Sequence, residues 1–170
     1  MNKYYKDFLI RSWEAKDRQS AAELIRGVLA EYGLGWEADG ADRDVVQVEE
    51  CYLDTAGEFW VIEYQNIVVG TGAYYPIERG QNAVKIRKMY FLPQIRGFGL
   101  GKYLLQQLEE AMSCDKPLRV YASRGFQEIW IETASILKEA VQMYEKNGYL
   151  PATGIETLRC DRVYFKKVNY

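Results

Sequence analysis

The sequence contains no histidine among its 170 residues. A Ser-His-Asp or Cys-His hydrolase of the usual kind is therefore excluded, because its general base is an imidazole. Zinc sites that combine cysteine with histidine are excluded for the same reason. Acid–base chemistry in this protein must use Glu, Asp, Tyr, Lys or water, and we predict no metal site.

Cysteine is also scarce, and the three that occur, Cys51, Cys114 and Cys160, form no C-x-x-C pair. Their odd number and wide spacing favour a reducing compartment. No apolar run is long enough to span a membrane, and the polar start MNKYYKDF is not a signal peptide. We therefore expect a cytoplasmic protein without a membrane partner.

The chain also lacks an excess of positive charge, since its formal net charge is −2. This balance gives no electrostatic footprint for nucleic acid, and we expect no nucleic-acid partner. The length fits one domain, residues 1–170, with room for a substantial core. Aromatic residues, by contrast, are abundant, and they supply core and pocket walls.

The most informative stretch runs from Met89 to Met112. It begins as an apolar strand, breaks at Pro93 and turns through three glycines into an amphipathic helix. A glycine-rich turn that opens a helix bares backbone N–H groups without intrahelical partners, and the helix dipole adds positive potential there. We therefore predict an anion site of the kind that binds phosphate or pyrophosphate. The alternative is an ordinary tight turn.

The spacing of the glycines separates the known kinds of phosphate loop. Gly97-x-Gly99-x-Gly101 is one residue short of the dinucleotide fingerprint, and Tyr103 stands where the Walker loop needs Ser or Thr after its Lys. The pattern that fits is Arg-x-x-Gly-x-Gly, beginning at Arg96. With the strand before it, this pattern resembles the coenzyme A pyrophosphate loop of the GCN5-related N-acetyltransferases, the GNAT superfamily.

The resemblance implies that the protein binds acetyl-coenzyme A (acetyl-CoA) as a co-substrate. The residues expected to hold its pyrophosphate are Arg96, Gly97, Phe98, Gly99, Leu100, Gly101 and Lys102. The residues expected to hold its pantetheine arm are Met89, Tyr90 and Phe91. In the resembling family this arm pairs, like a substitute strand, with backbone that is not used in the sheet.

The strand from Val84 to Leu92 changes parity along its length. Its apolar residues alternate from Val84, but after Lys88 they alternate from Met89 on the other parity. One way to change parity within a strand is an extra residue, and we predict a β-bulge there. A bulge frees backbone groups from the ladder, which agrees with the splayed strand that the resemblance implies.

The resemblance also implies the fold class, an α/β fold. Its features are a mixed, twisted central sheet, helices on both faces, and a V-shaped split between strands 4 and 5. Residue patterns predict strands at 8–11, 58–64, 67–77, 84–92 and 127–133, and a final hairpin of 155–158 with 163–168. They predict three helices: one that begins after Asp17 and reaches Tyr32, one at 100–112 and one at 136–147. Residues 45–53 fit helix or strand, and the resemblance favours helix.

A second constellation lies near the C-terminus. Tyr144 stands four residues before Gly148 on the helix that follows the strand ending at Thr133. This arrangement looks like the second acetyltransferase motif, which implies that Tyr144 is the general acid that protonates the departing thiolate. A phenol stays protonated at neutral pH and can donate. The alternative is a tyrosine that only packs in the core. Leu137 occupies a place where the family often has Asn.

The general base is less defined by the sequence. Glu132, near the carboxyl end of a predicted central strand, is our candidate, and Glu78 and Glu63 are alternatives. Each of them is equally compatible with a solvated or ion-paired carboxylate.

The sequence therefore predicts transfer of an acetyl group from acetyl-CoA to a primary amine, by direct attack in a ternary complex. The alternatives are a non-catalytic acyl-CoA sensor on the same fold and a nucleotide-binding phosphotransferase. The acceptor is open, either a small molecule or a peptide. The acidic residues Glu49, Glu50 and Asp54 are candidates for attracting a cationic amine. The oligomeric state is also open, and the resemblance makes a homodimer one candidate.

Overall fold

The computed structural model describes residues 1–113, 126–152 and 159–168. Its strands are β1 (Asn2–Tyr5), β2 (Phe8–Ser12), β3 (Glu58–Tyr64), β4 (Ile67–Ile77), β5 (Ala83–Phe91), β6 (Glu128–Thr133), β7 (Leu150–Pro151) and β8 (Arg162–Lys167). Its main helices are α1 (Arg18–Glu31), α2 (Arg43–Val46), α3 (Leu100–Ser113) and α4 (Lys138–Lys146). Shorter helical turns are η1 (Ala15–Asp17), η2 (Glu49–Leu53) and η3 (Pro93–Ile95).

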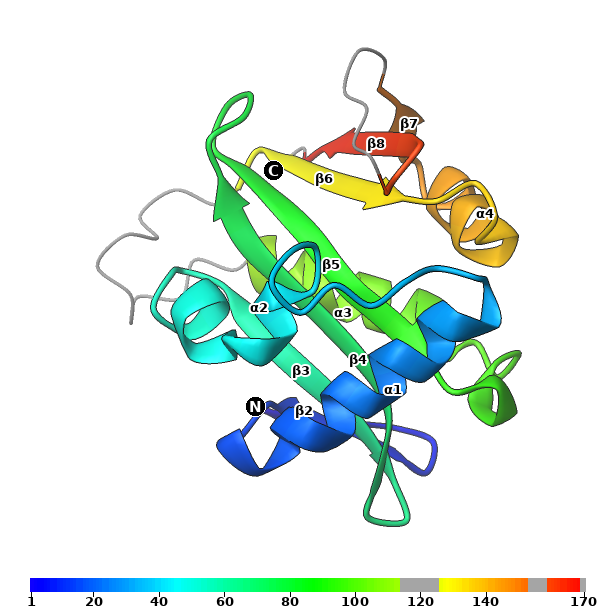
Figure 1. Cartoon of the computed structure of the whole chain (residues 1–170). Helices are drawn as coiled ribbons and strands as arrows, with labels where there is room; N and C mark the ends of the chain where they lie inside the picture. The colour runs from blue at the N-terminus through cyan, green and yellow to red at the C-terminus, as the bar shows by residue number, and fades with distance from the viewer. Residues whose placement is uncertain (114–125, 153–158, 169–170) are drawn as a thin grey trace.

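The central strand β3 is buried on both faces. Phe59 and Val61 belong to one core, and Trp60 and Ile62 belong to another. Side chains alternate along a strand, so a continuous apolar run supplies both cores. The first core packs against α1, α2 and η2, and the second against α3 and α4. Helices therefore cover both faces of the sheet (Figure 1).

The described sheet has the order β1-β2-β3-β4-β5-β6-β8-β7. Its strands pair antiparallel except β5 and β6, which are parallel. A parallel pair needs a crossover, and α3 lies in the connection between these two strands. The mixed sheet with helices on both faces confirms the predicted fold class.

The parallel pairing of β5 with β6 is short. It joins Ala83 through Ile86 to Glu128 through Ile131 and then stops, although β5 continues to Phe91. Beyond Ile86 the two strands diverge (Figure 1). This is the predicted V-shaped split. The predicted strands 4 and 5 carry the labels β5 and β6, because β1 was missed in the sequence.

The predicted bulge is confirmed in β5. The register with β4 passes from Ala73 opposite Arg87 to Thr71 opposite Tyr90, so two residues of β5 face one residue of β4. Lys88 is one of the two, and it has a positive φ of 55°. Its carbonyl accepts a hydrogen bond of 2.6 Å from the Thr71 hydroxyl. The bulge turns Met89 onto the face that packs against α3 and α4.

Most of the other predicted elements are confirmed, including the hairpin of β3 with β4, the helix α1 and the helical state of residues 45–53. The predicted helix at 136–147 begins slightly later, at Lys138. The first arm of the predicted final hairpin, 155–158, and the segment 113–124 beyond Ser113 lie outside the described residues. None of the described helices combines the length and the apolar character that crossing a bilayer requires.

Candidate active site

A cavity of about 550 Å³ opens beside the end of β5, between the glycine loop and α4. Nine of the ten residues predicted to bind acetyl-CoA line it: Met89, Tyr90, Phe91, Arg96, Gly97, Gly99, Leu100, Gly101 and Lys102. The exception is Phe98, which is 50% exposed and whose ring lies against Phe8. We refer to this space as the cofactor cavity. The residues of the predicted cofactor motif therefore line one side of a single cavity.

The glycine loop presents unused hydrogen-bond donors to the cofactor cavity. Along α3, the hydrogen bonds of the helix begin at Tyr103, whose backbone N–H donates to the Gly99 carbonyl at 3.1 Å. Within the described part of the chain, the N–H groups of residues 97–102 donate to no protein acceptor. Helix N-termini leave such groups open, and anions are the ligands that satisfy them.

Two glycines of the loop have conformations that favour glycine. Gly97 has φ +86° and Gly99 has φ +81°. A Cβ atom at Gly99 would also lie 2.8 Å from the hydroxyl of Tyr5, whereas one at Gly97 would meet nothing within 4 Å. That hydroxyl donates to the Phe98 carbonyl at 3.0 Å. The strand β1, which shows no apolar alternation in sequence, therefore supports the loop from behind.

Arg96 lines the cofactor cavity and also joins separate elements of the fold. Its guanidinium donates to both carboxylate oxygens of Glu31, at 2.7 and 2.8 Å, and to the Phe91 carbonyl at 2.8 and 3.0 Å. Hydrogen bonding to Glu31 raises the pKa of Arg96. The side chain thus braces the end of β5 against α1. Lys102 is exposed on the same cavity and has no ion pair among the described residues, so its charge is available.

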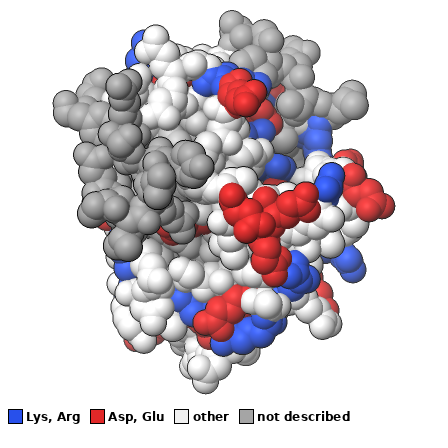
Figure 2. Space-filling view, turned by 90° about the vertical axis from the view of Figure 1, so that its left-hand side faces the viewer, with Lys and Arg blue, Asp and Glu red and all other residues white. Residues whose placement is uncertain are grey.

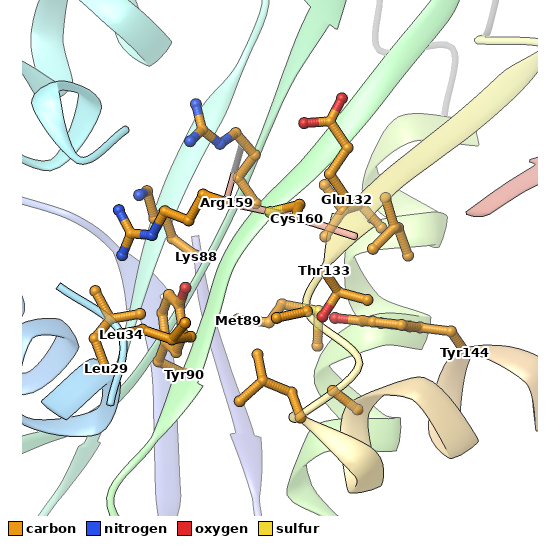
Figure 3. A pocket seen from close by; sticks show the side chains of 16 residues that line it. Leu29, Leu34, Lys88, Met89, Tyr90, Glu132, Thr133, Tyr144, Arg159 and Cys160 are labelled. Carbon is orange, nitrogen blue, oxygen red and sulfur yellow. The ribbon is translucent and has the colours of Figure 1, made fainter. Parts of the chain in front are cut away.

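Tyr144 lies between the cofactor cavity and a smaller inner cavity of about 60 Å³, and it lines both. The residue is 5% exposed, and its ring packs against those of Tyr149 and Tyr164. Figure 3 shows the ring extending from α4 toward Thr133 and Met89, between the diverging strands. Burial raises the pKa of Tyr144 well above that of a free phenol, so the hydroxyl carries its proton at neutral pH.

The predicted candidate base Glu132 also lines the inner cavity. Its carboxylate is engaged by Lys85 and lies 3.6 Å from Arg79. The alternatives lie elsewhere: Glu63 forms an ion pair with Arg11, and neither Glu63 nor Glu78 lines the inner or the cofactor cavity. The structure therefore brings Glu132 and Tyr144 to one cavity and leaves the other two carboxylates outside it.

A third space, of about 270 Å³, adjoins the inner cavity, and we refer to it as the acceptor-side cavity. It is lined by Glu37, Ala41, Asp42, Lys85, Arg87, Lys88, Tyr90, Glu132, Arg159 and Cys160. Six of these also line the inner cavity, so the hollow continues from the glycine loop past Tyr144 to a charged end. Sequence reasoning missed most of this set, because its members come from distant segments.

Leu137, at the start of α4, faces the cofactor and inner cavities. The place where the resembling family often has Asn is therefore an apolar part of the wall here. Met143, which the sequence analysis also missed, lines the cofactor cavity and would lie 3.3 Å from a Cβ atom at Gly101. The residues near the middle of the cofactor cavity thus suit an aliphatic chain, and the residues at the glycine loop suit an anion.

Comparison with known proteins identifies this arrangement. The model of the Acetyltransferase (GNAT) family matches residues 22–149, a span that includes the glycine loop, the split strands and Tyr144. The chain belongs to the GNAT family. It is 35% identical over 147 residues to the uncharacterized N-acetyltransferase YjgM of Escherichia coli (strain K12), covering 83% of this chain and 81% of that relative.

Solved structures agree on the GNAT fold. An acetyltransferase from Streptococcus agalactiae 2603 has a TM-score of 0.80 at 22% identity, covering 96% of this chain and 100% of that chain. A predicted acetyltransferase from Clostridium acetobutylicum, solved with acetyl-CoA, has a TM-score of 0.70 at 18% identity, covering 89% of this chain and 95% of that chain. Family and relatives together support an acyltransferase that uses acetyl-CoA.

Proposed function

We propose that this GNAT protein transfers the acetyl group of acetyl-CoA to a primary amine by direct attack in a ternary complex. The observation that carries the proposal is the continuity of three parts. Open backbone donors suit the pyrophosphate, a long partly apolar cavity suits the pantetheine, and a buried phenol stands where the cavity narrows. An acyl-CoA is a substrate whose parts match all three in that order.

The chemistry is a single displacement at the thioester carbonyl. The neutral amine donates its lone pair to the carbonyl carbon, and a tetrahedral intermediate forms with a negative oxygen. A backbone N–H of the splayed segment 89–91 is our candidate donor to that oxygen. Collapse breaks the C–S bond, and the sulfur leaves with the bonding pair. The products are an amide and free coenzyme A.

In this scheme Tyr144 supplies the proton that the leaving sulfur takes. A thiol titrates near pH 8.5 and a phenol near pH 10, so the transfer is uphill in water. Burial changes this comparison, because it penalises a thiolate as well as a phenolate. The raised pKa of Tyr144 therefore keeps the donor protonated without removing its ability to protonate an equally buried sulfur.

The amine must also lose a proton. Glu132 is our candidate acceptor for it, directly or through a water molecule. The ion pairs of Glu132 with Lys85 and Arg79 oppose this role. A carboxylate that accepts a proton loses its negative charge, and with it part of its attraction to the two cations. Release of the proton to solvent through the acceptor-side cavity is the alternative.

The test is turnover of acetyl-CoA with a panel of primary amines, measured as release of free thiol, together with calorimetric titration of acetyl-CoA and coenzyme A. We expect saturable binding of both and thiol release that depends on the amine. Binding without turnover on any amine would favour an acyl-CoA sensor. Absence of binding would refute the proposal, and tight binding of ATP in its place would support a phosphotransferase.

A further inference from the structure

The acceptor-side cavity carries a surplus of positive charge. Four of its lining residues are cations, Lys85, Arg87, Lys88 and Arg159, and three are carboxylates, Asp42, Glu132 and Glu37. Arg79 and Asp44 form ion pairs with members of this set from outside the lining, one of each sign, so the surplus of one positive charge is unchanged. Glu37 is exposed. Buried charges are normally balanced, so a local surplus favours an anionic ligand.

Arg159 and Arg79 each have a buried guanidinium nitrogen without a hydrogen-bond partner among the described residues, and of the two only Arg159 lines the acceptor-side cavity. The Nη1 atom of Arg159 donates to Asp42 at 2.6 Å, and its Nη2 atom is the buried nitrogen without a partner in the described part of the chain. Both oxygens of Asp42 are engaged by other donors, since Asp42 also accepts from Lys88 at 2.6 Å and from the N–H of Glu37 at 3.0 Å. A buried donor without an acceptor is costly, and a ligand oxygen would remove that cost.

The other cations of the cavity are held by protein groups. Arg87 donates to the Ala41 carbonyl at 2.9 Å and lies 3.1 Å from Asp44. Lys85 is paired with Glu132. Burial lowers the pKa of Lys85, although Glu132 acts to raise it. The unsatisfied nitrogen and the surplus charge therefore lie at the same end of the hollow.

The position of that end relative to the reaction centre limits what can bind. Figure 3 shows Arg159 and Lys88 on one side of the pocket and Tyr144 on the other, with Met89 between them. An acceptor whose amine reaches the neighbourhood of Tyr144 would extend back toward Arg159. Its far end would meet the guanidinium nitrogen that lacks a partner.

The acidic residues that the sequence suggested for a cationic amine do not contribute here. Glu49 binds Arg18 at 2.5 Å and Glu50 lies 3.6 Å from Arg43. Neither they nor Asp54 line the cofactor, inner or acceptor-side cavity. In Figure 2, on the side of the molecule that lies at the left of Figure 1, acidic side chains stand beside basic ones. Glu49 and Glu50 are therefore engaged in surface ion pairs, and the three carboxylates lie apart from the described cavities.

From these observations we infer that the acceptor is a primary amine that carries a carboxylate, and that Arg159 binds this carboxylate. The inference rests on the proposed acetyl transfer and specifies its second substrate class. Arg159 acts as a specificity-determining residue, and the planar guanidinium suits a carboxylate better than a lysine ammonium does. Asp42 orients it by holding the other nitrogen.

The experiment compares matched amines in the wild-type protein. The probes are L-leucine, β-alanine, 4-aminobutanoate and 6-aminohexanoate, each against its own primary amide, with 1,5-diaminopentane as a cationic probe. Rates of thiol release are expressed per concentration of neutral amine, because a carboxylate and an amide alter the amine pKa differently. We expect at least one carboxylate to exceed its amide by about 10-fold or more in kcat/KM.

Variants of Arg159 assign the preference to this side chain. Arg159→Gln should lower kcat/KM for the preferred carboxylate by about 10- to 100-fold, mainly through KM, and change it less than about 3-fold for the amide. Arg159→Lys keeps a cation beside Asp42 and should show an intermediate loss, which guards against a folding defect in the first variant. Arg43→Gln removes an equal charge from an exposed ion pair and should leave the preference unchanged.

The failures are separable. If acetyl-CoA binds and amides or the diamine are acetylated as well as every carboxylate, the carboxylate inference is overturned and the proposed function stands. If no probe is acetylated, calorimetric titration of the protein–coenzyme A complex with the same probes measures their binding. Absence of saturable binding by every carboxylate probe then overturns the inference. If acetyl-CoA itself does not bind, the proposed function fails instead.

Discussion

Replacing Tyr144 with Phe removes one hydroxyl and leaves the packing of the ring intact. The ring centroids of Tyr149 and Tyr164 lie 5.9 and 6.3 Å away, and a phenylalanine ring would keep both contacts. Among the described residues the Tyr144 hydroxyl has no hydrogen-bond partner, so no protein contact is lost. We therefore expect the free energy of unfolding to change by less than about 1 kcal/mol.

The effect on turnover should be large. General acid catalysis contributes about 10²- to 10⁴-fold to a rate, which corresponds to about 2.7–5.4 kcal/mol of transition-state stabilisation. We expect Tyr144→Phe to lower kcat by a factor in this range, with affinity for coenzyme A within about 3-fold of wild type. Initial rates of thiol release give kcat, and calorimetry gives the affinity.

Tyr149 supplies a matched control. It is 1% exposed, and its hydroxyl donates to Glu109 at 2.8 Å without lining any of the three cavities. Tyr149→Phe should cost about 1.5–3 kcal/mol of unfolding free energy, because a hydrogen bond to a charged group is lost, and should leave kcat nearly unchanged. A Tyr144→Phe variant that retains wild-type kcat, or that loses rate no more than Tyr149→Phe, would refute the general-acid role.

Two further predictions concern stability, both measured by denaturant unfolding. Gly97→Ala and Gly99→Ala should each cost about 1–2 kcal/mol from their positive φ. Of the two variants, Gly99→Ala should cost more unfolding free energy, because its Cβ atom would lie 2.8 Å from the Tyr5 hydroxyl. In a Tyr5→Phe background this extra cost should vanish. Equal costs of the two variants in the wild-type background would contradict the prediction. Burial acts to raise the pKa of the Asp42 carboxyl. Lys88 and Arg159 act in the opposite direction and outweigh burial, so the pKa of Asp42 is lowered. Its contribution is thus present at neutral pH and lost as the pH falls below about 4, so Asp42→Asn should cost about 3 kcal/mol at pH 7 and progressively less in acid. A difference that stays constant with pH would count against the ion pair.

Local patterns predicted much of the fold because each depends on nearby residues. The Val, Ile, Trp and Tyr content of 58–64 and 67–77, on either side of Gln65 and Asn66, predicted the hairpin of β3 with β4. A parity change predicted the bulge at Lys88. By contrast, β1 has a polar sequence without alternation, and only its pairing with β2 makes it a strand. The ion pair of Arg96 with Glu31 could not be predicted for a similar reason, since Glu31 approaches it from a distant helix.

The sequence by itself determined the glycine loop that opens α3, the tyrosine on the helix that follows β6, and the family resemblance that joins them. These depend on glycine backbone freedom and on helical spacing, which act over a few residues. Only the tertiary structure decided which charges meet at the acceptor end. Asp42, Lys85, Lys88 and Arg159 come from a loop, a bulged strand and a segment near the C-terminus, and their ion pairs form only after the sheet has brought those segments together.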